Sequence, residues 1–258
     1  MRHRALILAL ALTLGGVAPA MAERLVVSLS NHRIAITSSF VGDDLVLFGT
    51  IEPDPGKTLP QANYNLVVTV SGPSQTLKTR RKERVAGIWV NVDSREFLRV
   101  PSYLAILTNR PVETIAPVDT RRSLQLGLDN FLLTQRVGGD FADTVPDDPF
   151  RLAFVRLETQ HGLYRQDSTA VTFLTPTVFR VAIPIPSNVP TGNFNVDVKL
   201  FANGAMVTRT GTALEVIKAG FEQYVADAAR DRGLLYGMVT ALMALFIGWF
   251  GSVVFRRD

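Results

Sequence analysis

Apolar and alternating segments, separated by Gly- and Pro-rich turns, fill the first part of the chain after residue 22. The segments most typical of strands are 25–29, 33–37, 44–51, 64–70 and 85–92. Short strands that recur about every 10 to 15 residues between turns are typical of an antiparallel sandwich. The pattern therefore predicts an N-terminal β lobe over residues 23–93.

Residues 94–166 change to helical spacing. We expect a short helix at 102–108 and a longer one at 121–133. The clearest helix begins at Asp148-Pro149, since Asp is a good N-cap and Pro a favoured first residue. Apolar side chains then recur with amphipathic spacing, at Phe150, Ala153, Phe154 and Leu157. These segments predict a central helical subdomain.

Residues 167–218 return to strand patterns, and Asn203-Gly204 is the strongest hairpin signal in the chain. The expected strands are 170–174, 178–185, 194–201, 205–210 and 212–217. The last of them resemble the closing strands of an immunoglobulin-like domain. Two arrangements are open: one sandwich with a helical insertion, or two immunoglobulin-like β lobes that flank a helical subdomain, which we favour. The expected fold class is mainly β with a central helical segment.

The apolar segment 234–255 contains no charged residue over its 22 positions. At 1.5 Å per residue it would span about 33 Å, enough for the hydrocarbon core of a bilayer. Tyr236 and Trp249 near its ends, and Arg256 and Arg257 after it, are the expected membrane-interface anchors. The pattern predicts one transmembrane helix, preceded by a juxtamembrane helix over 219–233 and followed by a short tail, 256–258.

Residues 1–22 have the features of a secretory signal: basic Arg2 and Arg4, an apolar stretch, and Ala20-Met21-Ala22 before the expected cleavage site. An uncleaved first membrane helix is the alternative, although the apolar stretch is short for one. Since such a signal directs the chain behind it across the membrane, we expect a single-pass protein of a bacterial inner membrane. The bulk of the chain would lie in the periplasm and the C-terminus in the cytoplasm.

Charge and composition narrow the function classes. The formal net charge is +4, but four of the 27 Lys and Arg and one of the 23 Asp and Glu lie in residues 1–22 and 256–258, which leaves +1 for the exported part. We therefore expect no nucleic-acid binding. The chain has no Cys, which excludes disulfides, thiolate metal sites and a Cys nucleophile.

Candidate chemistry is sparse. After residue 22 the chain has two His, His32 and His161, and no metal-ligand spacing, nucleophile motif or nucleotide-binding glycine motif. Asp43-Asp44 is typical of a turn, and Asp148 is accounted for as a helix cap. We expect no catalytic residues, no metal, no cofactor and no enzymatic activity; a hydrolase built on His32 or His161 is the least supported function.

Five basic residues within seven positions form the one local charge cluster: Lys78, Arg80, Arg81, Lys82 and Arg84. They predict a docking patch for anionic headgroups or an acidic partner. The alternative is the solvated surface of an edge strand, whose charges discourage strand pairing. Trp89, a few residues later, is expected in the core. The segment from Tyr103 to Arg110 is a second candidate interaction surface, and the alternative is that its side chains pack in the core.

Several segments taken together resemble a known family. They are VLFGT at 46–50, RKERVAGIWVN at 81–91, PSY at 101–103, GLY at 162–164, GFEQY at 220–224 and the apolar ending at 234–257. They resemble a family of transmembrane proteins described from Alphaproteobacteria, which has no assigned activity. The resemblance implies a bacterial origin and the same membrane topology. It further implies a transporter-like partner in the same membrane, and it transfers no catalytic residues.

Two functions are consistent with these patterns. The first is a membrane-anchored periplasmic interaction or accessory protein, which would assist an inner-membrane transporter. The alternative is a periplasmic module that binds or senses a small molecule or an envelope polymer. A pocket with convergent polar groups would favour the alternative.

Overall fold

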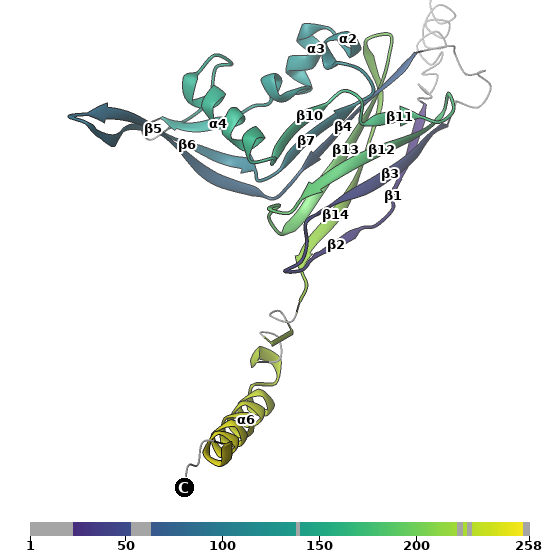
Figure 1. Cartoon of the computed structure of the whole chain (residues 1–258). Coiled ribbons are helices and arrows are strands. Elements are labelled where there is room, and N and C mark those ends of the chain that lie inside the picture. Colours follow the sequence, from purple (N-terminus) through teal and green to yellow (C-terminus); the bar gives the residue numbers. More distant parts are fainter. Residues whose placement is uncertain (1–22, 53–62, 138–139, 221–223, 226–228, 255–258) are drawn as a thin grey trace, which may run out of the picture.

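The structure is a computed structural model that describes residues 23–52, 63–137, 140–220, 224–225 and 229–254. These residues form three β-sheets and one long C-terminal helix (Figure 1). The mainly β class and the apolar C-terminal helix predicted from the sequence are therefore confirmed.

Two of the sheets face each other across an apolar core. The first has the order β1-β3-β12-β11 and consists of β1 (Arg24–Leu29), β3 (Gly42–Glu52), β11 (Val171–Phe173) and β12 (Val178–Pro186). The second has the order β10-β7-β4-β13-β14-β2 and consists of β2 (Arg33–Ile36), β4 (Tyr64–Ser71), β7 (Leu104–Thr108), β10 (Tyr164–Asp167), β13 (Gly192–Ala202) and β14 (Ala205–Lys218). Leu47 and Phe179 of the first sheet meet Val68 and Val198 of the second in this core, because alternate residues of each strand point toward the other sheet.

Strands from both ends of the β-rich region lie side by side in these sheets. β12 pairs with β3 in the first sheet, and β13 pairs with β4 in the second, both antiparallel. The two stretches predicted as separate lobes, 23–93 and 167–218, thus share their sheets. This arrangement matches the other alternative, one sandwich that carries an inserted segment.

The part of the second sheet that contains β7 is covered on both faces. All five residues of β7 are buried. Ala105 and Leu107 point into the core between the two sheets, whereas Leu104 and Ile106 point into a second core on the opposite face. The helix predicted at 102–108 is therefore wrong, because a strand that is buried on both faces has a continuous apolar run without alternation.

The described residues between β7 and β10, which we call the inserted segment, cover the second core. The short helices of this segment are α2 (Val112–Ile115), α3 (Val118–Ser123) and the 3₁₀ turn η1 (Leu128–Asn130). The long helix predicted at 121–133 is wrong, since Gln125 and Gly127 adopt positive φ angles of 53° and 94° and end the helical path. The apolar spacing there is satisfied by an irregular chain, in which Leu126 and Leu133 are fully buried.

Helix α4 (Pro149–Gln160) confirms the helix predicted from Asp148-Pro149. The Asp148 carboxylate accepts hydrogen bonds from the backbone N–H groups of Phe150 (2.8 Å) and Arg151 (3.1 Å), as an N-cap residue does. Phe154 packs against Phe97 and Tyr164 with ring centroids 5.0 and 5.7 Å apart. These contacts fix α4 on the second core.

The third sheet has the order β5-β6-β8-β9 and contains the longest hairpin. Its strands are β5 (Ser74–Val85), β6 (Ile88–Pro101), β8 (Thr134–Val137) and β9 (Asp140–Asp143). Ala86 and Gly87, with φ angles of 49° and 88°, make the tight turn between β5 and β6. Figure 1 shows this hairpin extending beyond the rest of the body. The hairpin predicted at Asn203-Gly204 is confirmed between β13 and β14.

Helix α6 (Gly233–Val254) agrees with the predicted transmembrane segment. Within the described residues it is the one helix long and apolar enough to cross a membrane, over Gly233–Ser252, and none of its apolar stretch is buried by protein. Figure 1 shows α6 pointing away from the sheets. The predicted signal at 1–22, the tail at 256–258 and part of the juxtamembrane segment at 219–233 lie outside the described residues.

Candidate functional site

The basic cluster lies on β5, in the hairpin that extends from the body. Strand geometry places Lys78, Arg80, Lys82 and Arg84 on one face, with successive side chains about 6.8 Å apart. All four are exposed. The other face of β5 carries Leu77, which packs against the second core, and buried Thr79. The cations therefore form a row on the solvent face of the hairpin, which we call the basic row.

Apolar side chains are exposed at the end of the same hairpin. Val85 pairs with Ile88 across the turn, and Arg84 pairs with Trp89. Their exposed fractions are 51% for Val85, 65% for Ile88 and 68% for Trp89. The prediction that Trp89 is a core residue is therefore wrong: it follows the turn of a hairpin whose end no other described element covers. Since Trp89 and Arg84 are cross-strand partners, the indole lies at the end of the basic row.

A groove runs between β5 and α4. It has a volume of about 380 Å³ and is lined by Thr79, Arg80, Arg81, Lys82, Pro149, Phe150, Ala153, Arg156 and Leu157. The α4 residues are spaced so that they share one helix face. The β5 residues are four in succession, and successive side chains point to opposite faces of a strand. The lining includes no residue of β6, which pairs with the other side of β5, and this places the hollow at the outer edge of β5. We call it the edge groove.

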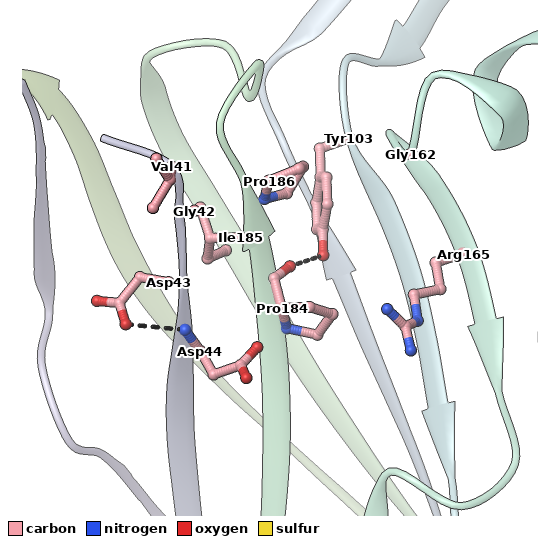
Figure 2. Close-up of a pocket in the computed structure, with 10 residues that line it drawn as sticks. All are labelled: Val41, Gly42, Asp43, Asp44, Tyr103, Gly162, Arg165, Pro184, Ile185 and Pro186. Carbon is pink, nitrogen blue, oxygen red and sulfur yellow. Dashed lines mark hydrogen bonds between the residues drawn. The ribbon is translucent and has the colours of Figure 1, made fainter. Parts of the chain in front are cut away.

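A second hollow, of about 590 Å³, lies where β3, β7, β10 and β12 approach one another (Figure 2). Asp43 and Asp44 of β3 border one side of it and Arg165 of β10 borders the other. The Asp43 carboxylate accepts a hydrogen bond from the Asp44 backbone N–H at 2.9 Å. We call this hollow the polar hollow.

The Arg165 guanidinium is held in place by the Asp167 carboxylate. It donates to the Asp167 carboxylate at 3.0 Å, and the backbone N–H and hydroxyl of Thr169 donate to the same carboxylate at 2.9 and 2.8 Å. These hydrogen bonds hold the pKa of Asp167 below its ordinary value of 3.8. The guanidinium is thus positioned beside the polar hollow, with Asp167 ionised at neutral pH.

The predicted surface at Tyr103 and Arg110 is not one surface. Tyr103 precedes β7 and is 1% exposed; its ring packs against Phe194, and its hydroxyl donates to the Pro184 carbonyl at the border of the polar hollow. Burial raises the pKa of the Tyr103 hydroxyl. Arg110 follows the opposite end of β7 and is exposed. Neither residue lines the edge groove, so the structure groups only the β5 cations among the predicted interaction residues.

The predicted membrane-interface residues lie on α6 or beyond it. Tyr236 is in its first turn and Trp249 near its C-terminal end, with exposed fractions of 37% and 62%. Arg256 and Arg257 lie outside the described residues. Among the residues that the structure describes, no group of three or more His, Asp or Glu could hold a metal ion.

Two features of the site are not predicted by the sequence. The turn at Ala86-Gly87 was not expected, because it lacks the Asn-Gly or Asp-Gly pair that marks such turns most strongly. The groove face of α4, with Ala153 and Arg156, depends on which strand packs beside that helix, and this follows from tertiary structure alone. The one signal in the sequence was Gly87 between two strand-like segments.

Comparisons with known proteins identify a family and a similar solved structure. The family model described as "Putative transmembrane protein (Alph_Pro_TM)" matches residues 24–257. No curated protein matches. The chain is similar, at 10% identity and a TM-score of 0.27, to the N-terminal domain of the Streptococcus gordonii adhesin Sgo0707 in its crystal structure; the match covers 78% of this chain and 33% of that one.

Proposed function

Since this chain belongs to the Alph_Pro_TM family of transmembrane proteins, we propose that it is a membrane-anchored interaction protein that docks a membrane protein through its β5–β6 hairpin. The proposal includes export of the β-rich body to the periplasm of a bacterial inner membrane and a transporter-like complex as the docked partner. It includes no catalytic step and no cofactor.

One observation carries this proposal: the hairpin exposes a basic row and an apolar end on the same projecting element. Isolated exposed apolar residues are ordinary, but Val85, Ile88 and Trp89 are all exposed at the end of one hairpin, and Trp89 lies on the face that carries the four aligned cations. Trp and Arg are enriched at the centres of protein interfaces, where each supplies a large contact area. An acidic partner surface would complement the row, and an apolar pocket would receive Trp89.

The anchor makes such docking effective at low intrinsic affinity. A helix that holds the body at the membrane confines the hairpin to the volume in which an integral membrane partner also diffuses. Binding then resembles an intramolecular event, with an effective concentration that the connecting segment sets. A partner in the same membrane is therefore favoured over one that diffuses freely.

We also propose that the two facing sheets form an immunoglobulin-like sandwich, the finer class expected from the sequence. The antiparallel β13–β14 hairpin and the pairing of β12 with β3 support this proposal. The inserted segment and the β5–β6 hairpin would be additions to that framework.

Site-specific photo-crosslinking in intact membranes tests the proposed docking. A photoreactive amino acid at Trp89 of the full-length chain should give a discrete adduct with an integral membrane protein. Arg80→Glu with Lys82→Glu should reduce the adduct about tenfold or more, because two cations that would face an acidic partner surface become carboxylates that it repels. Arg122→Glu with Arg180→Glu, which changes the net charge equally at exposed positions elsewhere, should leave it unchanged. Equal loss in both double variants, or no membrane-protein adduct, would contradict the proposal.

The polar hollow supports the second candidate, a module that binds a small molecule or an envelope polymer. Its volume lies in the range of small-molecule sites, and it offers carboxylates opposite a fixed guanidinium. A ligand with both an amino group and an anionic group would suit it. If this candidate is right, such a ligand should raise the melting temperature of the full-length chain, and Arg165→Ala should remove the shift. A ligand that stabilises both chains equally would count against it.

A further inference from the structure

The edge groove carries an inference about how the partner is recognised. It rests on the proposed function, because it concerns the same hairpin, but it specifies a binding mode that docking by the basic row does not require. Three properties of the groove bear on this mode: a free strand edge, a facing helix and cations on both walls.

The strand at the groove is an edge strand. In the third sheet β5 pairs with β6 on one side only. Along its other side, every second residue directs its backbone N–H and C=O outward, and these groups can pair with an additional strand. The groove follows this side at Thr79, Arg80, Arg81 and Lys82, so an occupant would lie next to backbone groups as well as side chains.

The opposite wall supplies an apolar surface. Phe150, Ala153 and Leu157 of α4 face the groove, and Leu157 is 38% exposed. A peptide that adds to a strand directs alternate side chains to opposite faces, so one set would meet this helix face. Grooves between a strand edge and a helix bind extended peptides in this way: backbone pairing supplies affinity, and side-chain pockets supply specificity.

The charges of the groove select the occupant. Arg80, Arg81 and Lys82 lie on the strand wall and Arg156 lies on the helix wall. Arg81 also pairs with Glu83 at 3.1 Å, where both side chains are more than half exposed, so water weakens that pair and leaves Arg81 available. A second copy of β5 would bring like charges together, whereas a strand with carboxylates at alternate positions would meet cations. The charges that discourage pairing of this edge with itself therefore favour pairing with an acidic strand.

We propose that the edge groove binds an extended acidic segment of a partner protein, which pairs with β5 as an added strand and packs its apolar side chains against α4. Figure 1 shows β5 at the border of its sheet with α4 beside the hairpin. Lys78 and Arg84 of the basic row, together with Trp89, lie outside the groove lining and stay free to contact the folded part of that partner.

A peptide that mimics such a segment tests the binding mode. The probe is a short blocked peptide in which Glu alternates with Val, labelled with fluorescein and titrated into the full-length protein in detergent micelles. It should bind with an affinity that falls as salt rises, and the same peptide with Lys in place of Glu should not bind. Bound peptide should also slow hydrogen exchange of the backbone amides of β5.

N-methylation separates strand addition from attraction by charge alone. An added strand uses the N–H of every second residue, so methylation of one alternate set should weaken binding about tenfold or more, and methylation of the other set should have little effect. If both methylated peptides bind as tightly as the parent, or if the parent does not bind at about millimolar concentration, the inference is overturned.

Two variants on neighbouring positions of α4 complete the test. Ala153→Glu places a carboxylate in the groove and should weaken the peptide about tenfold, whereas Leu152→Glu, at an exposed position outside the lining, should change its affinity less than about twofold. If the Ala153→Glu variant binds the peptide as tightly as the unaltered protein does, the inference is overturned. If the groove fails these tests but the crosslink at Trp89 persists, the docking proposal stands without strand addition; if that crosslink also fails, both are wrong.

Discussion

Replacing Arg151 by Met is expected to lower the free energy of unfolding by about 2 to 4 kcal/mol. Arg151 lies in the first turn of α4 and is 4% exposed. One terminal nitrogen of its guanidinium donates to the backbone carbonyls of Leu128 (3.3 Å), Asp129 (2.8 Å) and Phe131 (2.7 Å). Met fills much of the volume of the apolar stem but donates nothing, so these carbonyls would lose their donor.

The expected loss is large because Arg151 connects two parts of the inserted segment. The carbonyls belong to the 3₁₀ turn η1 and the residue after it, where the chain is irregular. Burial lowers the pKa of Arg151, but an arginine stays charged at neutral pH. Charged donors make stronger hydrogen bonds than neutral ones. The guanidinium therefore replaces the regular backbone pairing that this segment lacks.

Urea denaturation of the full-length protein in micelles measures this effect. Arg156→Met is the matched control, because it makes the same substitution on the exposed face of the same helix and should change the unfolding free energy by less than about 0.5 kcal/mol. Arg151→Lys should recover part of the loss through its ammonium donors. A value for Arg151→Met close to that of the control would show that water satisfies the three carbonyls and that the side chain is not needed.

The β-rich class was readable from the sequence where one face of a strand is buried and the other exposed. The first half of β13 shows this pattern, and the Asn203-Gly204 turn after the strand was correctly located. β7 lacks it, since Leu104 and Ile106 point into a different core from Ala105 and Leu107. Alternation is a signal of unequal faces, so a strand between two cores cannot show it.

The sequence predicts the charges of the candidate site but not its shape. The basic residues of β5 were identified from their density, and their exposure follows from the hairpin that carries them. Trp89 was misplaced because a large aromatic residue in a strand is usually buried, and only the tertiary structure shows that no described element covers the end of this hairpin. The edge groove depends on α4, which is about 70 residues further along the chain. A pattern within one segment carries no information about such a neighbour.

The membrane helix α6 has the strongest signal in the sequence, and the structural reason for that signal is simple. A helix that is apolar on every side needs an apolar environment all round. In α6, Leu234, Leu245 and Ile247 are 88%, 71% and 66% exposed, and no part of its apolar stretch is covered by the described protein. Lipid is the environment that would cover these side chains, in agreement with the family to which the chain belongs.

Placing two arginines in α6 is therefore expected to release the protein from the membrane. Ala241→Arg with Leu245→Arg puts two charges on one helix face near the middle of Gly233–Val254. Each charge costs about 2.5 to 3.5 kcal/mol at the centre of a membrane helix, so the pair should oppose insertion by about 5 to 7 kcal/mol. Alkaline carbonate extraction of membranes measures the effect: the unaltered chain should stay in the pellet, and the variant should appear in the supernatant.

Ala241→Leu with Leu245→Ala, which keeps the apolar composition at the same positions, should behave like the unaltered chain. If the arginine variant stays in the pellet, α6 is not the anchor that holds the body at the membrane, and the effective concentration on which hairpin docking depends must arise from another segment.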